Sequence, residues 1–355
     1  MCSIAGVICK KENNAADIIL KMLNEMRHRG PDGVGVLINK EIFRAKSLNE
    51  LDLNGKKSCF SIGSSRLAIL DHYEGTQPIK GCKDIFIILN GEIYNCLGLL
   101  KELAHHRLTK SIDTEVIIHL FEEQLKKYDL IESVKRTLRY LDGMYAFAIA
   151  LEDKIIISRD PVGIKPLYLT ENNDLIAFAS ERKALWRLGI KDGIFPLNPG
   201  TFAIIGRKGI EFHKEFNFEE KSFSNIEFEE TQKNLLSLLN SSVKKMVKYK
   251  KLGILFSGGL DSYLIAHIAR NLGANVELFC SSFDKYLDKQ NAFSGAKSIG
   301  LPLHFYRLTL HEIEESLTKI LCAIEEPSPL NLSIAIPIYF ATKLAKERSF
   351  KVVLS

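Results

Sequence analysis

The feature that most constrains the fold is a change in sequence pattern near residue 210 of the 355-residue chain. Before it, short runs of β-type residues are bounded by turn residues. In one case the runs 145–151 and 154–158 flank Glu152-Asp153, which predicts a hairpin with a two-residue turn. Two stretches, 15–27 and 113–127, have helical periodicity. Many strands with few helices predict an α+β domain over residues 1–210.

The second part of the chain alternates between strands and helices. A polar, Glu-rich stretch, 211–230, is predicted to be a connector. After it we predict strands at 252–256, 276–280, 303–307 and 351–354, and helices at 231–247, 262–272, 289–299, 311–324 and 335–347. Strands separated by helices of this length predict a parallel sheet, and therefore an α/β domain over residues 231–355.

Composition limits the classes of partner. Apolar residues make up 46% of the chain and charged residues 26%, which is ordinary for a soluble globular protein. The net charge is only +5, and the densest basic stretch, 244–251, has a helical pattern, so no nucleic acid is predicted as a partner. Apolar runs are far shorter than a membrane span, and the N-terminus lacks the features of a signal peptide. We therefore expect no membrane association.

Cysteine usage indicates a reducing compartment. The seven cysteines form an odd set without paired spacing, which argues against a disulfide framework. Neither a C-x-x-C nor an H-x-x-x-H pattern occurs, so the sequence gives little support to a zinc site. A cytoplasmic location is predicted, where a catalytic thiol would stay reduced.

The second residue, Cys2, is a candidate nucleophile. Met aminopeptidases remove the initiator methionine when the next side chain is small, so Cys2 can become the N-terminal residue. It would then carry a thiol and a free α-amine, which titrates near about pH 8 and can accept the thiol proton. The alternative is that Cys2 is a small buried residue that begins a strand.

A candidate phosphate site follows the predicted strand 252–256. The string Ser257-Gly258-Gly259-Leu260-Asp261-Ser262 leads from that strand into an amphipathic helix. Small residues let backbone N–H groups surround an anion, and the helix N-terminus adds partial positive charge. The ending of a Walker A loop is missing, and Asp261 indicates a metal that bridges phosphates. The alternative is a Gly-rich turn with Asp261 or Ser262 capping the helix.

Together the two motifs carry a specific likeness. The string SGGLDS is similar to the pyrophosphate loop of PP-loop ATP pyrophosphatases. A chain that combines it with CSIAG at residues 2–6 resembles the glutamine-hydrolysing asparagine synthetases, which have a class II glutamine amidotransferase domain. Further matches run along essentially the whole chain, at 27–32 (RHRGPD), 66–69, 90–95, 113–115, 159–168 and 178–181. The resemblance implies an N-terminal-nucleophile hydrolase fold, with stacked antiparallel sheets between helices, followed by a PP-loop domain of the adenine-nucleotide hydrolase type.

The resemblance also implies a glutamine site. It makes Cys2 the nucleophile, and it makes the Asn90 side chain and the Gly91 N–H the oxyanion donors. Arg66 matches the residue that clamps the glutamine α-carboxylate, and Asp113 matches the carboxylate that meets the α-ammonium group. The same pocket would be lined by Glu92 and by the backbone of Leu67 and Ile69.

Simpler interpretations of the same residues stay open. Asp113 could cap the predicted helix, Asn90-Gly91 could form a hairpin turn, and Arg66 could make a surface ion pair. The 27–32 stretch could only fix a loop near the pocket, and the 159–168 stretch could be strand and turn framework.

A second reaction is implied, in which ATP activates the side-chain carboxylate of aspartate and ammonia displaces AMP. The loop residues Ser257, Gly258, Gly259, Asp261 and Ser262 would hold pyrophosphate and Mg²⁺, with Asp261 as the metal ligand. Leu255 and Ser281 match positions that meet adenine, although Leu255 could equally be strand core. We also place Ser355, which follows the last predicted strand, in the ATP site.

The resemblance departs from the family pattern at the end of the chain. In the family the strand at 351–354 leads into a second Gly-rich loop with another Mg²⁺-binding Asp, and later helices complete the aspartate pocket. We therefore expect an incomplete synthetase domain and retained glutaminase chemistry. The alternatives are a relative that amidates another carboxylate and a glutamine-binding sensor. The partners implied are glutamine, aspartate and ATP, and a homodimer stays open.

Overall fold

The computed structural model describes residues 2–12, 14–68, 75–101, 103, 106, 112–217, 227–247, 251–284 and 287–355. It divides into two compact units, Met1–Glu220 and Lys221–Ser355. Strand β13 (Gly209–Lys214) pairs with β12 (Thr201–Gly206), so the first unit continues past the predicted boundary at residue 210 and into the predicted connector. Among the described residues, no helix combines the length and apolarity needed to cross a membrane.

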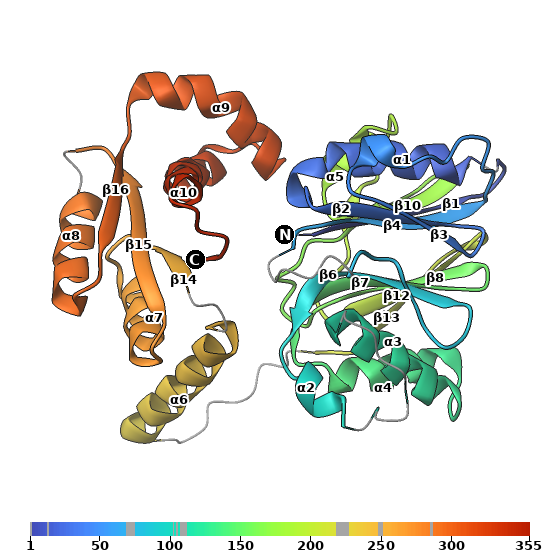
Figure 1. Ribbon diagram of the computed structural model, residues 1–355, viewed down its shortest axis with the longest axis horizontal. Helices are drawn as coiled ribbons and strands as arrows, with labels where there is room; N and C mark the ends of the chain where they lie inside the picture. The colour runs from blue at the N-terminus through green and yellow to red at the C-terminus, as the bar shows by residue number, and fades with distance from the viewer. Residues whose placement is uncertain are drawn as a thin grey trace. The chain divides into compact units, whose positions relative to one another are not determined.

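The first unit stacks two antiparallel sheets between layers of helices (Figure 1). The first sheet has the order β11-β9-β10-β1-β4-β2-β3, and the second has the order β13-β12-β8-β7-β6-β5. The strands of the first sheet are β1 (Ser3–Cys9), β2 (Gly33–Ile38), β3 (Glu41–Ala45), β4 (Phe60–Arg66), β9 (Tyr168–Glu171), β10 (Leu175–Ala179) and β11 (Phe195–Pro196). Besides β12 and β13, those of the second are β5 (Ile79–Lys80), β6 (Ile85–Ile93), β7 (Gly143–Leu151) and β8 (Lys154–Arg159).

Helices cover the outer face of each sheet. The first sheet packs against α1 (Ala15–Glu25) and α5 (Arg182–Trp186), and the second against α2 (Cys96–Leu99), α3 (Ile112–Leu125) and α4 (Leu130–Tyr140). A third apolar core fills the space between the sheets, where β1 and β6 contribute Ile4 and Ile88. Because both faces of the inner strands are buried, β1 is buried at every position.

Most predicted elements of the first unit are confirmed, including the hairpin β7–β8 and the helices α1 and α3. The Asn90-Gly91 pair is different from a hairpin turn, because β6 continues through it to Ile93. In the register with β7, Asn90 lies opposite Ala146 and Gly91 opposite Tyr145. The turn interpretation is therefore wrong, since pairing along all of β6 overrides the local turn preference.

The second unit contains a parallel sheet of order β16-β15-β14-β17. Its strands are β14 (Lys251–Leu255), β15 (Asn275–Ser282), β16 (Leu303–Arg307) and β17 (Val353–Leu354). Its helices are α6 (Phe228–Met246), α7 (Leu260–Asn271), α8 (Leu287–Ile299), α9 (Leu310–Ile324) and α10 (Pro329–Glu347). Helix α10 begins earlier than predicted, because Ser328 caps it by accepting a hydrogen bond from the Asn331 N–H, and Pro329 fits its first turn.

Candidate functional site

Cys2 immediately precedes β1, beside the end of β4. Ser3 lies opposite Ser65 in the register of these strands, which brings Cys2 next to Arg66 and Leu67. The thiol of Cys2 points toward the carbonyl oxygen of Leu67, 4.0 Å away, and Cys2 is half-buried. The structure therefore brings together the predicted nucleophile and two residues of the predicted glutamine site.

The 27–32 stretch holds the backbone of Cys2. The Nε of Arg29 donates a hydrogen bond of 3.0 Å to the carbonyl oxygen of Cys2. Gly30 packs directly on β4, where a Cβ would lie 2.3 Å from the carbonyl carbon of Ser65. Asp32 accepts a hydrogen bond of 2.8 Å from the Ala68 N–H. These contacts agree with the interpretation that this stretch fixes a loop next to the pocket.

A buried carboxylate, Glu181, fixes Arg29 in turn. One oxygen of Glu181 accepts from Arg29 at 2.9 Å and lies 3.1 Å from the His28 ring, and the other lies 2.9 Å from the Lys183 ammonium. Burial alone would raise the pKa of Glu181, but the hydrogen bonds and charges of these three neighbours lower it to about 2. The carboxylate is therefore ionised near neutral pH and anchors the chain of contacts that reaches Cys2.

Asn90 supplies an unpartnered hydrogen-bond donor. Its side chain is 1% exposed, and the described part of the chain offers no hydrogen-bond partner to Nδ2. Buried polar groups are almost always hydrogen-bonded, so an orphaned amide donor calls for an explanation. A ligand oxygen that needs such a donor would provide one.

Gly91 and Asp113 organise the end of β6 next to Asn90. A Cβ on Gly91 would lie 2.5 Å from the carbonyl oxygen of Met144 on the paired strand β7, so the close approach of the two strands requires glycine here. In the first turn of α3, Asp113 accepts a hydrogen bond of 3.1 Å from the Ile93 N–H. Asp113 therefore connects α3 to β6, in addition to any role toward a ligand.

Arg66 ends β4 with its guanidinium group available. The guanidinium group makes no hydrogen bond or ion pair with any residue that the structure describes, although the Arg66 carbonyl oxygen accepts from the Asp32 N–H at 3.0 Å. Among these residues, therefore, the side chain forms no surface ion pair. A Cβ on Gly75 would lie 3.0 Å from an Arg66 nitrogen, so this glycine leaves space beside the guanidinium. Glu92 is half-buried on β6. Ile69, also predicted for this pocket, lies outside the described residues.

Lys165 is a residue of this site that the sequence did not single out. Its side chain is 8% exposed, and burial lowers its pKa, with the charge of Arg29 adding to this effect. The charges of Cys2, Asp160 and Glu92 raise the pKa of Lys165 and so oppose the effect of burial. Cys2 immediately precedes β1 of the first sheet and Glu92 lies on β6 of the second, so Lys165 is close enough to both to be influenced by their charges.

The 159–168 stretch is the framework that presents Lys165. The Asp160 carboxylate accepts from four successive backbone N–H groups, those of residues 162 to 165, at 2.6 to 3.2 Å. Arg159 donates to the carbonyl oxygens of Gly163, Lys165 and Leu197. Gly163 has a φ of 78°, which favours glycine. An aspartate followed within a few residues by a glycine turn and a lysine is the local signal that would have indicated this arrangement.

In the second unit the predicted phosphate loop lies between β14 and α7. Gly258 has a φ of 78°, and a Cβ on it would lie 2.3 Å from the backbone of Asn291 on α8. Ser257 accepts from the Gly259 N–H at 3.2 Å, and Ser262 donates to the Gly259 carbonyl oxygen at 3.0 Å. These contacts shape a tight loop whose Ser257, Gly259 and Asp261 positions are exposed at a helix N-terminus.

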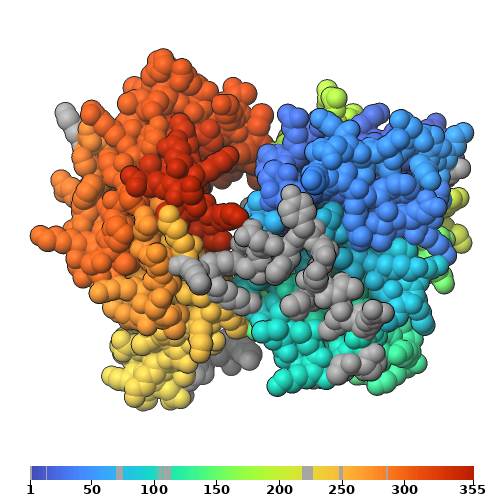
Figure 2. All heavy atoms as spheres, viewed as in Figure 1, coloured from blue at the N-terminus to red at the C-terminus, as the bar shows by residue number. Residues whose placement is uncertain are grey.

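The carboxyl ends of three strands place the other predicted ATP residues on one edge of the sheet. Leu255 ends β14, and Ser355 follows β17, which pairs with β14 so that Ile254 lies opposite Leu354. The C-terminal residues reach the surface of the second unit in the face drawn in Figure 2. Ser281 of β15 donates its hydroxyl to the Pro337 carbonyl oxygen at 2.7 Å, so its side chain is engaged within the fold. Leu255 packs in an apolar cluster, as the strand-core interpretation expects.

Asp261 fits the predicted role of a magnesium ligand as a single carboxylate. It lies exposed in the first turn of α7, beside the loop that would hold phosphates. Mg²⁺ in nucleotide sites is typically bound through one or two carboxylates together with phosphate oxygens and waters. Within the described residues, Asp261 belongs to no group of three or more metal-binding side chains.

Two family profiles match the chain. One is described as "Glutamine amidotransferase domain" and covers residues 1–195, and the other as "Asparagine synthase" and covers residues 234–355. A putative glutamine-hydrolysing asparagine synthetase of Methanocaldococcus jannaschii is 35% identical, and the alignment covers all of this chain and 67% of the relative. Asparagine synthetase 2 of Arabidopsis thaliana is 28% identical, with all of this chain and 59% of the relative covered. The chain therefore spans about two thirds or less of the length of these relatives.

Solved structures support the fold. The glutamine phosphoribosylpyrophosphate amidotransferase from B. subtilis matches with a TM-score of 0.55 at 21% identity, over 88% of this chain and 70% of that one. An allosteric regulatory enzyme of purine biosynthesis matches with a TM-score of 0.56 at 22% identity and the same coverage. By these profiles and relatives, the chain belongs to the family of glutamine-hydrolysing asparagine synthetases.

Proposed function

We propose that this chain hydrolyses the side-chain amide of glutamine to glutamate and ammonia, with Cys2 as the nucleophile. The observation that carries the proposal is the buried, unpartnered Nδ2 of Asn90. An amide donor held without a partner in a buried site is suited to the oxyanion that forms when a thiol attacks a carbonyl carbon. The family, whose relatives are named as glutamine-hydrolysing, supports the same reaction.

The proposed chemistry needs the α-amine of Cys2, which becomes free when Met1 is removed. The amine takes the thiol proton as Sγ attacks the glutamine amide carbon, and Asn90 and the Gly91 N–H stabilise the oxyanion. Collapse of this intermediate breaks the C–N bond and releases ammonia, which leaves with the proton from the amine. Water then attacks the thioester, and glutamate and the free thiol are restored.

The amino-acid end of glutamine would be held by charges of opposite sign. Arg66 has a guanidinium group without a partner among the described residues, and its planar donors suit a bidentate contact with the α-carboxylate. Asp113 and Glu92 offer carboxylates at the end of β6 for the α-ammonium group. The backbone of Leu67, which the Cys2 thiol faces, belongs to the proposed pocket.

The glutaminase half can be tested by glutamate release from the full chain. We expect Cys2→Ala to abolish activity and Asn90→Ala to lower kcat by about 10²–10³-fold, because one oxyanion donor is lost. Matched controls are Cys322→Ser and Asn54→Ala, which change exposed positions outside the site and should leave kcat unchanged. Mass spectrometry of the N-terminus checks that Met1 is removed. Glutaminase activity that survives Cys2→Ala, or an unaltered kcat in Asn90→Ala, would contradict the proposal.

We further propose that the second unit binds ATP and Mg²⁺ for an ATP-dependent amidation. The backbone of Gly258 and Gly259 and the hydroxyls of Ser257 and Ser262 would hold the pyrophosphate part, and Asp261 would hold the metal. Bound Mg²⁺ supplies charge neutralisation for the phosphates. The acceptor that the family favours is the side-chain carboxylate of aspartate, which would make asparagine the product. Amidation of another carboxylate is the alternative, and ATP-dependent product formation with each acid distinguishes the two.

The proposed setting is a reducing compartment such as the cytoplasm. None of the seven cysteines, all of which lie in the described part of the chain, forms a disulfide, which agrees with a thiol-dependent reaction.

A further inference from the structure

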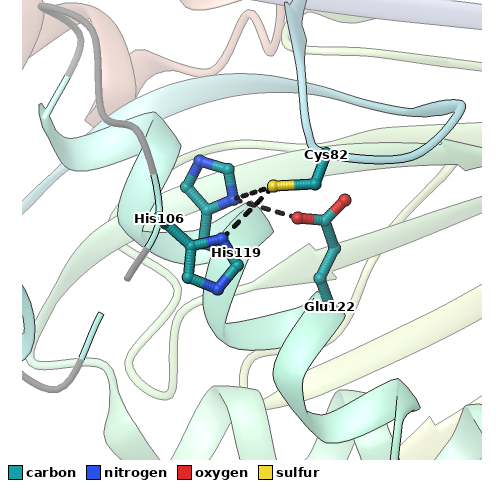
Figure 3. Close-up of side chains that lie close together, drawn as sticks. All are labelled: Cys82, His106, His119 and Glu122. Atoms are coloured by element: carbon teal, nitrogen blue, oxygen red, sulfur yellow. Dashed lines mark hydrogen bonds and ion pairs between the residues drawn. The ribbon is translucent and has the colours of Figure 1, made fainter. Parts of the chain in front are cut away.

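Four potential metal ligands converge in the first unit, away from Cys2. They are Cys82, His106, His119 and Glu122, and their ligand atoms all lie within 4.8 Å of one another. Cys82 lies in the connection between β5 and β6, and His106 precedes α3 in the sequence. His119 and Glu122 lie three residues apart on α3, and so on one face of that helix. Figure 3 shows the sulfur, both rings and the carboxylate pointing toward one another.

The two distances from the Cys82 sulfur to the histidine nitrogens match those in a tetrahedral zinc site. Cys82 Sγ lies 3.3 Å from His106 Nδ1 and 3.8 Å from His119 Nδ1. Ligand atoms around a tetrahedral zinc lie roughly 3.3–3.8 Å apart, as bond lengths of about 2.0–2.3 Å require. His119 Nδ1 and Glu122 Oε2 are closer, at 2.9 Å, so a small side-chain rotation would admit the ion between them.

The surroundings orient the ligands as in known zinc proteins. His106 Nε2, the nitrogen turned away from the cluster, lies 2.8 Å from a carboxylate oxygen of Glu123. Such a carboxylate fixes the ring and leaves the other nitrogen to bind metal. The second oxygen of Glu122, Oε1, accepts a hydrogen bond of 2.9 Å from the Lys83 N–H, which leaves Oε2 directed into the cluster.

Burial gives the cluster a closed side and an open side. His119 is 4% and Glu122 3% exposed, and a Cβ on Gly81 would lie 2.5 Å from Glu122 Oε1. Charged groups buried to this degree are normally paired or bound to metal. Cys82 is exposed, so an ion can enter from its side.

We infer that Cys82, His106, His119 and Glu122 form a structural zinc site. Sulfur, nitrogen and oxygen ligands in this combination suit Zn²⁺, and four protein ligands close the coordination sphere, which is typical of a structural rather than a catalytic site. The ion would fasten the β5–β6 connection and His106 to α3. The same helix carries Asp113 of the proposed glutamine site, but none of the four ligands belongs to that site.

The primary test is the metal content of the full chain after purification without added metal. We expect about one zinc per chain by mass spectrometry of the metal, as a structural site requires. Replacement by Co²⁺ should give a thiolate-to-cobalt charge-transfer band, because Cys82 is a ligand. A chelator should lower the Tm of the wild-type chain. None of these readouts depends on glutaminase or synthetase activity, so their outcome is separate from that of the proposed function.

Variants identify the ligands. Cys82→Ser changes an exposed side chain, so it is expected to fold, to lose the charge-transfer band and to show no effect of chelator on Tm. His106→Gln should weaken zinc binding by at least about 100-fold, and Glu123→Gln, which removes only the orienting carboxylate, by about 10–100-fold. Cys322→Ser, an exposed cysteine on α9, is the matched control and should bind zinc as the wild type does.

Two results would overturn the inference. One is a chain that contains less than about one tenth of a zinc and takes up no Co²⁺ with thiolate absorption when it is titrated. The other is bound zinc whose amount and affinity are the same in Cys82→Ser and His106→Gln as in the wild type, which would indicate adventitious metal only.

Discussion

Cys2 is positioned through its backbone. Arg29 donates to the Cys2 carbonyl oxygen, and Glu181 holds Arg29 from the other side. The thiol itself is left facing the Leu67 carbonyl oxygen. A nucleophile that must attack and then leave during each turnover is therefore held by groups that need not change partners when the thiol reacts.

Removing the charge of Glu181 should affect both stability and glutaminase rate. Its folded-state pKa of about 2 lies below an unfolded value of about 4.3, so the charge stabilises the fold by roughly 3 kcal/mol near neutral pH. This contribution is complete above about pH 5 and is lost as pH falls toward 2. Urea unfolding should show Glu181→Gln to be less stable than the wild type at pH 7. The difference in unfolding free energy between the two should become smaller below about pH 4. Its kcat should also fall, because Arg29 loses its anchor.

The control for this prediction is Glu171→Gln, which removes a surface ion pair with Lys10. Exposed pairs contribute about 0–1 kcal/mol, so this variant should differ little from the wild type at any pH. Equal losses of unfolding free energy in Glu181→Gln and Glu171→Gln would refute the low pKa of Glu181. So would a stability difference between Glu181→Gln and the wild type that grows as the pH falls.

Sequence reasoning found the groups that carry a local signal and missed those that long-range contacts assemble. Cys2 is recognisable because its position after Met1 has chemical meaning. The turn that presents Lys165 has a local signal, but the burial of Lys165 and its nearness to Cys2 and Glu92 arise only from long-range contacts in the folded chain. The zinc ligands span Cys82 to Glu122 without a standard spacing, so no sequence motif points to them.

Strand pairing explains where predictions of elements succeeded or failed. Helices α6 to α9 of the second unit were located within a few residues because periodicity is a local signal, whereas α10 begins at Pro329, earlier than the predicted residue 335. Asn90-Gly91, by contrast, has the sequence of a turn but lies in the interior of β6. Pairing with β7 along the whole strand outweighs the local preference, and it places Asn90 where its side chain is buried.

The loop between β14 and α7 should tolerate no side chain at Gly258. Alanine there would adopt a left-handed conformation, which costs about 1–2 kcal/mol, and its Cβ would meet the Asn291 backbone, which adds about 1–3 kcal/mol. We expect Gly258→Ala to destabilise the second unit in urea unfolding. Isothermal titration with ATP and Mg²⁺ should also show weaker binding, because the loop must move away from α8.

Gly273→Ala separates the two costs. Gly273 also has a positive φ, 80°, but a Cβ on it would meet no atom within 4 Å. Gly273→Ala should therefore lower the free energy of unfolding only by the cost of the left-handed backbone conformation, about 1–2 kcal/mol. It should leave ATP binding unchanged. If both variants lose the same stability and bind ATP equally well, the packing of Gly258 against α8 does not shape the nucleotide loop.

At the level of the whole molecule, each unit has its own apolar cores. Three clusters lie within residues 4–216, between and outside the two antiparallel sheets, and three others lie within residues 239–354. Among the described residues, no cluster takes members from both units. The two halves of the chain therefore meet the main requirement for folding independently, and the predicted α+β and α/β organisation is confirmed in each.

A fragment of residues 1–220 should therefore fold and hydrolyse glutamine without the second unit. It contains Cys2, Arg66, Asn90, Asp113 and Lys165, together with the complete cores around both sheets. We expect a cooperative thermal transition that matches one of two transitions in the full chain, and a rate of glutamate release comparable to that of the full chain. The same fragment with Cys2→Ala is the control for background hydrolysis. A fragment that folds cooperatively but releases no glutamate would contradict this prediction. The five side chains in a folded first unit would then not be enough for catalysis, and the second unit would be required.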